Sequence, residues 1–553
     1  MARTIHVRTT SRHSGRVVSR RLDLVYAMAH LSLQTWALLG IVVVALVLRI
    51  LPLGAFSTEY DEGVYWLSLR AMTDGHLLYA SIYNAQAPFF FASLYPLFLL
   101  LGQTLVAARV AIALYSLVGI ATTYIIGNAV GSRYVGLAAA ALVAVDPLYL
   151  VQSRTLEAEM PSLALMLLGI ALALEAGRRR DARRDSQVTW LIVASGAFLG
   201  LALMVKLLAV VGLVPAALAL AWPAQLLQSR ADARIAHSSH IGDGPLVQPL
   251  WTELREAAPS LGRLLAGFFG ACLIVLVPLL ANLGTVYRQV VGVYLDASRL
   301  FGSPLQNNLH TLASLRGEWP LGLAAGFALA LALWRRSPIV LLVTAWALAT
   351  FAALLQQPTP WSHHFVFLVP PLALLVALFV RFAPSLSRPA RWQRTTGRLP
   401  LAPLQSALIT YGAVVVLSAA FLIGATLSAL EDQRAIIYPA ADEVVIVNAL
   451  RTRSVPSQPV VTDDPYLVGL AGRSVPPQLI DTSLVRIQTG NLTAKQIEAI
   501  VSAQGVNAIL FASGRLDQVP GLRAWVRRNY AVGQDFGDGR VLYLKQRAGE
   551  VVT

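Results

Sequence analysis

Long apolar runs separated by short polar loops make up most of the chain. A run of about 17 residues or more is long enough to cross a bilayer as a helix. We therefore predict a mainly α fold, a polytopic membrane helix bundle with about 11 transmembrane helices. The first predicted span is Trp36 to Leu53, and the others cover roughly 105–128, 134–151, 160–177, 188–205, 207–227, 264–283, 319–334, 338–355, 364–382 and 404–427.

Basic residues between these runs predict the orientation of the bundle. Residues 1–35 form a basic arm that contains six arginines, and five more arginines lie between Arg178 and Arg184. The loops on the other side hold few, such as Arg70 and Arg288. Because cytoplasmic loops are enriched in Lys and Arg, we predict a multi-pass plasma-membrane protein with a cytoplasmic arm. An odd number of spans then places the C-terminus outside.

Two short helices are predicted in the first outer loop, residues 54–104. The apolar stretch 89–101 is too short for an upright span, and counting it would place the Arg178–Arg184 cluster outside. We interpret it as an in-plane or shallow re-entrant helix. Residues 62–72 are predicted to form a second helix of this kind, surrounded by aromatic residues that favour the membrane interface.

The pattern changes after the membrane bundle, which we assign to residues 36–429. Polar and charged residues return, and we predict that residues 430–553 form a small extracytoplasmic α/β domain. Strands are predicted at Val460–Thr462, Ala508–Phe511 and Val541–Leu544. A helix is predicted from Thr493 to Gln504, with Thr493 as its cap.

Composition excludes several classes of protein. Of 553 residues, 56% are hydrophobic and 13% charged, whereas a soluble domain has about 25% charged residues. A soluble enzyme, a disordered chain and a fibrous protein are thereby excluded. The net charge of +15 is explained by the loop arginines, so no nucleic-acid partner is expected. The single cysteine, Cys272, permits no intramolecular disulfide and no cysteine-based metal site.

Acidic residues stand directly after the first span. Glu59, Asp61 and Glu62 lie where a carboxylate is costly and is by default a functional hypothesis. One of them could act as a base in a pocket at the membrane surface. Alternatively, Asp61 caps a helix that begins near Gly63.

The second outer loop carries Arg154, Glu157 and Glu159. Two glutamates could hold a divalent cation through oxygen ligands, or one of them could pair with Arg154. The alternative is again capping, because Pro161 and acidic residues suit the start of a helix.

Arg154 and four further residues are candidates for binding an anionic substrate such as the phosphate of a lipid donor. Lys206 is the one lysine before residue 430 and lies between two predicted spans. It could contact a lipid phosphate, or snorkel at a turn. His363 and His364 could donate to phosphate or bind a metal, although adjacent residues face different ways on a helix, so we do not expect both to chelate one ion. Arg109, near the outer end of the second span, is expected to pair with an acid of the first loop.

No phosphate-binding glycine-rich motif for nucleotides occurs in the sequence. Every candidate group is predicted on the outer face, so a transferase there would take its donor from the membrane. The multiple spans also fit a transporter or lipid flippase, although no internal repeat of the transporter kind is found. A non-catalytic scaffold with an outer binding domain is a third alternative.

The order of several short motifs resembles the GT-C class of membrane glycosyltransferases, over about residues 36–430. The resemblance is strongest to glycosyltransferase family 39 and the Rgt-like group, which are related to the protein O-mannosyltransferases and the lipid A aminoarabinose transferase. The motifs are Asp61-Glu62 with Tyr65, Gly75 to Tyr79, Pro88, Gly102, Arg109, Arg154, Glu159, Gly200 to Lys206, and His364-Phe365 with Pro370-Pro371. Gln86-Ala87 precedes Pro88 where a His or Lys is common, and Phe365 replaces a frequent Tyr.

The resemblance implies that Asp61 is the catalytic carboxylate and that Glu62 is its neighbour. It also implies a polyprenyl-phosphate sugar donor and inversion at the anomeric carbon. The acceptor would be a lipid, a glycan or a protein. We further expect Asp61, Glu159 and Lys206 to surround one outward-open cavity, with Arg154 nearby, because each charge would be costly to bury alone.

Overall fold

The computed structural model describes residues 32–51, 53, 60–179, 186–221, 247–315, 319–334, 338–359, 361–386, 424, 427 and 440–545. Predictions for the basic arm up to residue 31 and for Glu59 lie outside the described residues. The last predicted span, 404–427, also lies outside them, apart from positions 424 and 427.

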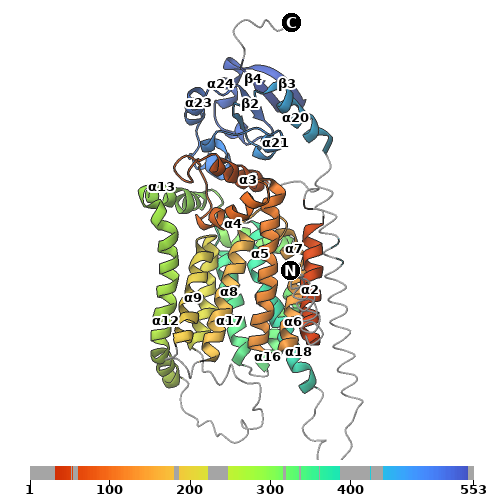
Figure 1. The fold of residues 1–553 in the computed structure, drawn as a ribbon, viewed down its shortest axis with the longest axis vertical. Coiled ribbons are helices and arrows are strands. Elements are labelled where there is room, and N and C mark those ends of the chain that lie inside the picture. Colours follow the sequence, from red (N-terminus) through yellow and green to blue (C-terminus); the bar gives the residue numbers. More distant parts are fainter. Residues whose placement is uncertain are drawn as a thin grey trace, which may run out of the picture.

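A bundle of apolar helices forms the larger part of the molecule (Figure 1). Its long helices are α2 (Leu33–Ile50), α5 (Leu105–Val130), α6 (Arg133–Val145), α8 (Glu159–Arg178), α9 (Ser186–Leu203), α10 (Leu213–Ala221), α12 (Val247–Leu276), α16 (Trp319–Trp334), α17 (Pro338–Leu355) and α18 (Val369–Leu386). Five described segments are long and apolar enough to cross a membrane: Leu33–Ile50, Leu105–Val130, Glu159–Arg178, Ser186–Leu203 and Arg255–Ala297. A multi-pass helical membrane bundle is thus confirmed, while the number of about 11 spans stays a prediction.

Helix α8 is the most buried of these five segments, with 83% of its apolar window inside the protein. It packs against α5, α9 and α10. The residues at its N-terminus therefore lie near the middle of one end of the bundle. Glu159 is the first residue of α8, so its carboxylate is held there by the packing of the whole helix.

Two predicted spans differ from the structure at their ends. The run 134–151 divides into α6 and the short α7 (Pro147–Gln152), because Asp146 before Pro147 adopts an extended backbone and caps α7 through the Tyr149 amide, 2.8 Å away. Lys206 is also extended and separates α9 from the 3₁₀ helix η2 (Leu207–Gly212). Both helix breaks therefore occur at a charged residue, Asp146 in one case and Lys206 in the other.

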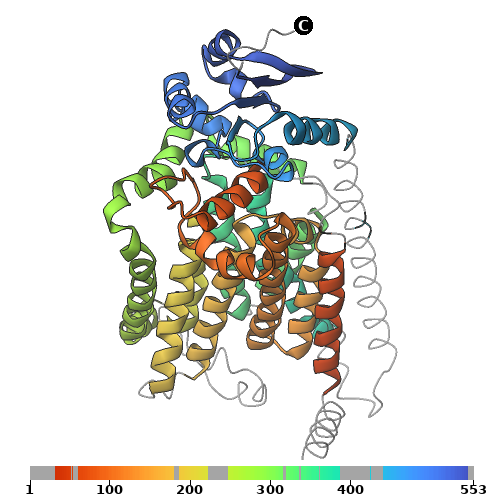
Figure 2. The same ribbon diagram turned by 45° about the horizontal axis from the view of Figure 1, so that its top comes forward.

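Short helices gather at this same end, facing the C-terminal domain (Figures 1 and 2). Helix α4 (Phe89–Leu100) has 12 residues, too few to cross a bilayer, in agreement with the predicted shallow helix. Its first amide, on Phe89, donates to the Met204 carbonyl over 2.8 Å. The other elements here are α3 (Tyr60–Thr73), η3 (Val277–Asn282), α13 (Leu283–Tyr287), the π-turn η4 (Arg288–Gly292), α14 (Val293–Ala297), α15 (Pro304–Ser314) and η6 (Ser362–Leu368).

Residues 440–545 form a small α/β unit built on a four-stranded sheet in the order β1-β2-β4-β3. Strand β1 (Val460–Thr462) is parallel to β2 (Ala508–Phe511), with Val461 opposite Ile509. Strand β4 (Arg540–Leu544) is antiparallel to both β2 and β3 (Ala531–Gly537). The helices are α20 (Ala440–Arg453), α21 (Pro465–Leu470), η8 (Pro477–Leu479), α22 (Leu484–Gln488), α23 (Ala494–Ala503), η9 (Leu516–Gln518) and α24 (Leu522–Asn529).

Sequence predicted most of this unit correctly. The strands at 460, 508 and 541 are found, and Thr493 forms a capping box with Gln496 at the start of α23. Strand β3 was missed, because it lies at the edge of the sheet, contains two bulges and alternates partly buried with exposed residues. Such a strand has little hydrophobic signal.

The α/β unit packs directly on α3 of the first loop. A Cβ on Gly63 would lie 2.7 Å from the Tyr466 backbone nitrogen, so only glycine permits this approach of α3 to α21. The rings of Trp66 and Tyr466 lie 6.5 Å apart across the same contact. Because α3 carries Asp61 and Glu62, this packing places the α/β unit over both acids.

Candidate functional site

Glu62 points from α3 into the bundle, and both of its carboxylate oxygens accept hydrogen bonds. Its carboxylate accepts from Nε and Nη2 of Arg109 at 2.8 and 2.6 Å and from the Leu156 amide at 2.7 Å. Both charged side chains are 1% exposed. Arg109 also donates to the Leu53 carbonyl at 2.7 Å. This bidentate pair, predicted from the position of Arg109, ties α3 to α5, to the end of the first span and to the loop before α8.

Asp61 takes a different direction, because adjacent residues are about 100° apart around a helix. The helix begins at Tyr60, so Asp61 lies inside the first turn and is not the cap that was considered for a helix starting near Gly63. It lines a cavity of about 100 Å³. Other polar and aromatic residues of this cavity are Tyr65, Tyr83, Gln86, Tyr294, Trp361 and Asp481.

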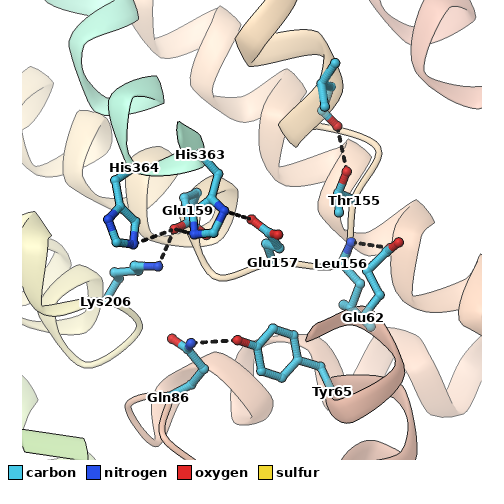
Figure 3. A network of polar contacts seen from close by, with 11 residues as sticks. Glu62, Tyr65, Gln86, Thr155, Leu156, Glu157, Glu159, Lys206, His363 and His364 are labelled. Atoms are coloured by element: carbon cyan, nitrogen blue, oxygen red, sulfur yellow. Dashed lines mark hydrogen bonds and ion pairs between the residues drawn. The ribbon is translucent and has the colours of Figure 1, made fainter. Parts of the chain in front are cut away.

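A second cluster of polar groups is centred on Glu159 (Figure 3). The Lys206 ammonium contacts the Glu159 carboxylate directly, with side chains that are 14% and 1% exposed. Nε2 of His363 and Nε2 of His364 lie 3.6 and 3.9 Å from the same oxygen, Oε1. Nδ1 of His363 faces Oε2 of Glu157 at 3.5 Å. The structure thus brings together candidates from two loops and from the α9–η2 turn, namely Glu157, Glu159, Lys206, His363 and His364.

The two histidines lie closer together than their adjacent positions led us to expect, although the structure does not test whether both bind one ion. They lie in the 3₁₀ helix η6, and their rings meet edge to face at 4.7 Å. Ligand atoms of Glu159, His363 and His364 all lie within 4.8 Å of one another. Two imidazoles and a carboxylate form the donor set of many zinc enzymes. Glu157 beside Nδ1 of His363 is placed like the carboxylate that orients a metal-binding histidine.

Tyr65 and Gln86 line the cavity and also lie near this cluster. Nε2 of Gln86 donates to the Tyr65 hydroxyl at 2.6 Å, and Figure 3 shows this pair facing Lys206 and Glu159. Burial, followed by the negative charge of Asp61 and with smaller effects from Glu157 and Glu159, raises the pKa of Tyr65 well above its ordinary value. The phenol therefore stays neutral. Besides burial, its pKa is raised by Asp61 in the cavity and by Glu157 and Glu159 in the cluster.

Arg154 lies at the base of the site and faces α2. It is 3% exposed, and its Nη1 donates to the Leu48 carbonyl at 2.7 Å. Nearby, Arg49 is fully buried and donates to the Ser116 hydroxyl at 2.9 Å and to the Ala144 carbonyl at 3.2 Å. Both arginines thus contact helix backbones at the end of the bundle that carries Glu159. Arg49 was not singled out from the sequence, although an arginine near the end of an apolar run was a visible signal.

Asp481 is the second residue that the sequence did not reveal. It comes from the α/β unit, is buried at 6% exposure and lines the same cavity as Asp61. No local pattern distinguishes it from other acids of that unit, because the cavity residues that it meets from the first loop and the bundle are more than a hundred residues away in sequence. Gln86 was noted only as a departure from the family pattern.

Comparison with known proteins identifies the fold. The sequence profile of dolichyl-phosphate-mannose-protein mannosyltransferases (PMT) matches residues 95–242. The structure is similar to that of ArnT from Cupriavidus metallidurans bound to undecaprenyl phosphate, with a TM-score of 0.59 at 17% identity over 93% of this chain and 98% of that one. The chain has the fold of the GT-C membrane glycosyltransferases. The resemblance stated from its motifs is thereby confirmed.

A second similar structure is the archaeal oligosaccharyltransferase AglB from Archaeoglobus fulgidus in complex with an inhibitory peptide and a dolichol-phosphate. The TM-score is 0.52 at 14% identity, over 94% of this chain and 75% of that one. Among the curated proteins, the comparison finds no match. Both structural matches extend over more than nine-tenths of this chain, so they include the helix bundle and the α/β unit, at sequence identities of 17% and 14%.

Proposed function

We propose that this chain is an inverting glycosyltransferase. It moves a sugar from a polyprenyl-phosphate donor to a lipid, glycan or protein acceptor on the extracytoplasmic face of the membrane. The observation that carries the proposal is the pairing of two unlike subsites at one end of the bundle. A cavity lined by Asp61 adjoins a cluster in which Lys206 and two histidines surround Glu159.

Each subsite would serve one part of the reaction: the cavity removes the proton of the acceptor hydroxyl, and the cluster stabilises the negative charge on the departing phosphate. Asp61 accepts the proton of the acceptor hydroxyl as that oxygen forms a bond to the anomeric carbon. The bond between this carbon and the phosphate oxygen breaks on the opposite face, which inverts the centre. Polyprenyl phosphate leaves with increasing negative charge, and Lys206, with a histidine N–H, stabilises it.

The neighbours support this choice of donor. The similar ArnT structure holds undecaprenyl phosphate, and the AglB structure holds a dolichol-phosphate. AglB has also been tethered with an acceptor peptide, in a structure with a TM-score of 0.51 to this chain. The fold gives no support to the alternatives of a transporter, a flippase or a non-catalytic scaffold.

Not all candidates keep their assigned role in this proposal. Glu62 and Arg109 satisfy each other in a buried pair, so we assign them to positioning α3 and not to catalysis or phosphate binding. Arg154 bonds to the α2 backbone and is assigned to the same scaffold. Glu159, His363 and His364 fit a divalent cation such as Zn²⁺, with Glu157 orienting His363 in place of being a ligand. Such an ion would supply additional positive charge near the departing phosphate.

The orientation of the bundle is also part of the proposal. Arg178 and Arg179 end α8 at the opposite end from Glu159, so the site and the α/β unit lie away from these basic residues. The positive-inside rule then places the α/β unit outside. A reporter that is active only outside the cytoplasm is expected to be active when fused to the C-terminus and silent when inserted between residues 179 and 186. The reverse pattern would contradict this orientation.

Binding of undecaprenyl phosphate to the full chain in nanodiscs tests the proposed function. We expect Lys206→Met to weaken binding by at least about tenfold, because one hydrogen bond to a charged group contributes about 1.5–3 kcal/mol. The matched control is Lys495→Met, since Lys495 is exposed on the α/β unit. Equal affinities in the wild type and in both variants would contradict the assignment of Lys206.

Metal content is measured on the same preparations. If the cation is present, His363→Ala and His364→Ala should each lower the bound zinc, and a chelator should weaken lipid binding by the wild type only. Wild-type protein that retains no metal after incubation with Zn²⁺ would exclude the cation. The phosphate subsite would then consist of Lys206 and the histidines.

A further inference from the structure

The cavity that Asp61 lines is completed by the α/β unit. Asp481, Ser483 and Val485 of that unit form part of its wall, opposite residues of the first loop. Asp481 and Asp61 therefore face one space of about 100 Å³, although 420 positions separate them in the sequence. The first loop contributes the carboxylate of Asp61 to this cavity, and the α/β unit contributes that of Asp481.

The position of Asp481 is fixed by contacts of the residues beside it. The Thr482 amide donates to the Tyr60 hydroxyl at 2.5 Å, and the two hydroxyl oxygens lie 3.2 Å apart. Tyr60 precedes Asp61 and Thr482 follows Asp481. The hydrogen bond between Tyr60 and Thr482 thus brings the adjacent acids, Asp61 and Asp481, to the same cavity.

Two arginines of the α/β unit strengthen this contact. The Arg486 guanidinium lies 3.6 Å from the centre of the Tyr83 ring, and that of Arg515 lies 4.0 Å from the Tyr60 ring. Cation–π contacts of this kind are worth about 0.5–2 kcal/mol each. Arg486 also donates from Nη1 to the Asp481 carbonyl. The backbone that carries Asp481 is therefore held against the first loop through Thr482 and Arg486.

The lining of the cavity suits a ring with several hydroxyl groups. Its wall contains two carboxylates, the Gln86 amide and the aromatic rings of Tyr65, Tyr294 and Trp361. Ionised carboxylates accept strong hydrogen bonds from hydroxyl groups, and aromatic side chains offer apolar faces with polar edges. The Tyr65–Gln86 pair, which lines the cavity, faces Lys206 and the histidines in Figure 3. A sugar whose phosphate contacts Lys206 would extend into this cavity.

We propose that Asp481 binds hydroxyl groups of the sugar carried by the donor, so that the α/β unit sets the selectivity for that sugar. This inference rests on the proposed function. It assigns Asp61 to the incoming hydroxyl and Asp481 to recognition. A site built to bond a hydroxyl discriminates strongly against analogues that lack it, which gives the α/β unit a measurable role.

The test compares bare undecaprenyl phosphate with a panel of its hexosyl, pentosyl and monodeoxy derivatives, using the full chain in nanodiscs. We expect the wild type to bind one sugar-bearing lipid more tightly than the bare lipid, and to lose affinity for one of its deoxy analogues. Asp481→Asn should lower affinity for the preferred sugar lipid by about tenfold or more and reduce the loss seen with the deoxy analogue. The asparagine keeps the bond that Oδ1 of Asp481 accepts from the Ser483 amide at 2.8 Å.

Affinity for bare undecaprenyl phosphate distinguishes a loss of sugar recognition from misfolding of the variant. Unchanged affinity for the bare lipid shows that the variant is folded, and Asp517→Asn is the matched control, because Asp517 pairs with Arg523 elsewhere on the same unit. The inference is overturned if Asp481→Asn binds the preferred sugar lipid like the wild type, if it weakens both lipids equally, or if no sugar raises the affinity of the wild type. A wild type that binds no lipid phosphate at all refutes the proposed function instead.

Discussion

Replacement of Asp61 by Asn is expected to lower the rate of sugar transfer by about two to four orders of magnitude. The amide has the size of the carboxylate but cannot accept the proton of the acceptor hydroxyl. Asp61 lines the cavity, whereas its neighbour Glu62 pairs with Arg109 on another face of α3. The measurement is the rate at which the full chain in nanodiscs transfers sugar from its preferred undecaprenyl-phosphate donor.

The control for this variant is Asp74→Asn, near the other end of α3, where the side chain is exposed and faces a different cavity. Asp74→Asn should keep the wild-type rate. Binding of undecaprenyl phosphate should be the same in both variants, because Lys206 is untouched. An Asp61→Asn protein that transfers sugar at the wild-type rate would contradict the role of Asp61 as base.

Loss of the Glu62 carboxylate is expected to destabilise the protein. Glu62→Leu leaves the Arg109 guanidinium, which is 1% exposed, without its bidentate partner. Removing one member of a buried pair costs about 3–5 kcal/mol, and the Leu156 amide loses its acceptor as well. We expect a lower unfolding temperature in detergent and less monodisperse protein on size-exclusion chromatography.

The double variant Glu62→Leu, Arg109→Leu distinguishes this structural role from a catalytic one. Apolar side chains in place of a buried pair are often tolerated, so the double variant should regain part of the stability that the single variant loses. It should also regain part of the activity, because α3 returns to its position. A Glu62→Leu protein that is as stable as the wild type and yet inactive would instead support a catalytic role for Glu62.

The sequence alone determined the membrane bundle and most of the outer unit. Apolar runs at 319–334 and 338–355 coincide with α16 and α17, because length and hydropathy decide a span almost without reference to its neighbours. The strand at Val460–Thr462 and the cap at Thr493 are equally local signals. Acids and basic residues at one end of the bundle were visible for the same reason, since a charge inside an apolar run is rare.

Only the tertiary structure decided which of these charged residues contact one another. Asp61 and Glu62 are neighbours in sequence, but helix geometry sends one to a cavity and the other to Arg109. Packing of η6 brings both histidines near Glu159, although adjacent residues of a helix point in different directions. Asp481 reaches the cavity through packing of α21 on Gly63 and the bond from Thr482 to Tyr60. Contacts between segments so distant in the chain depend on the whole packed fold, and no local pattern of residues encodes them.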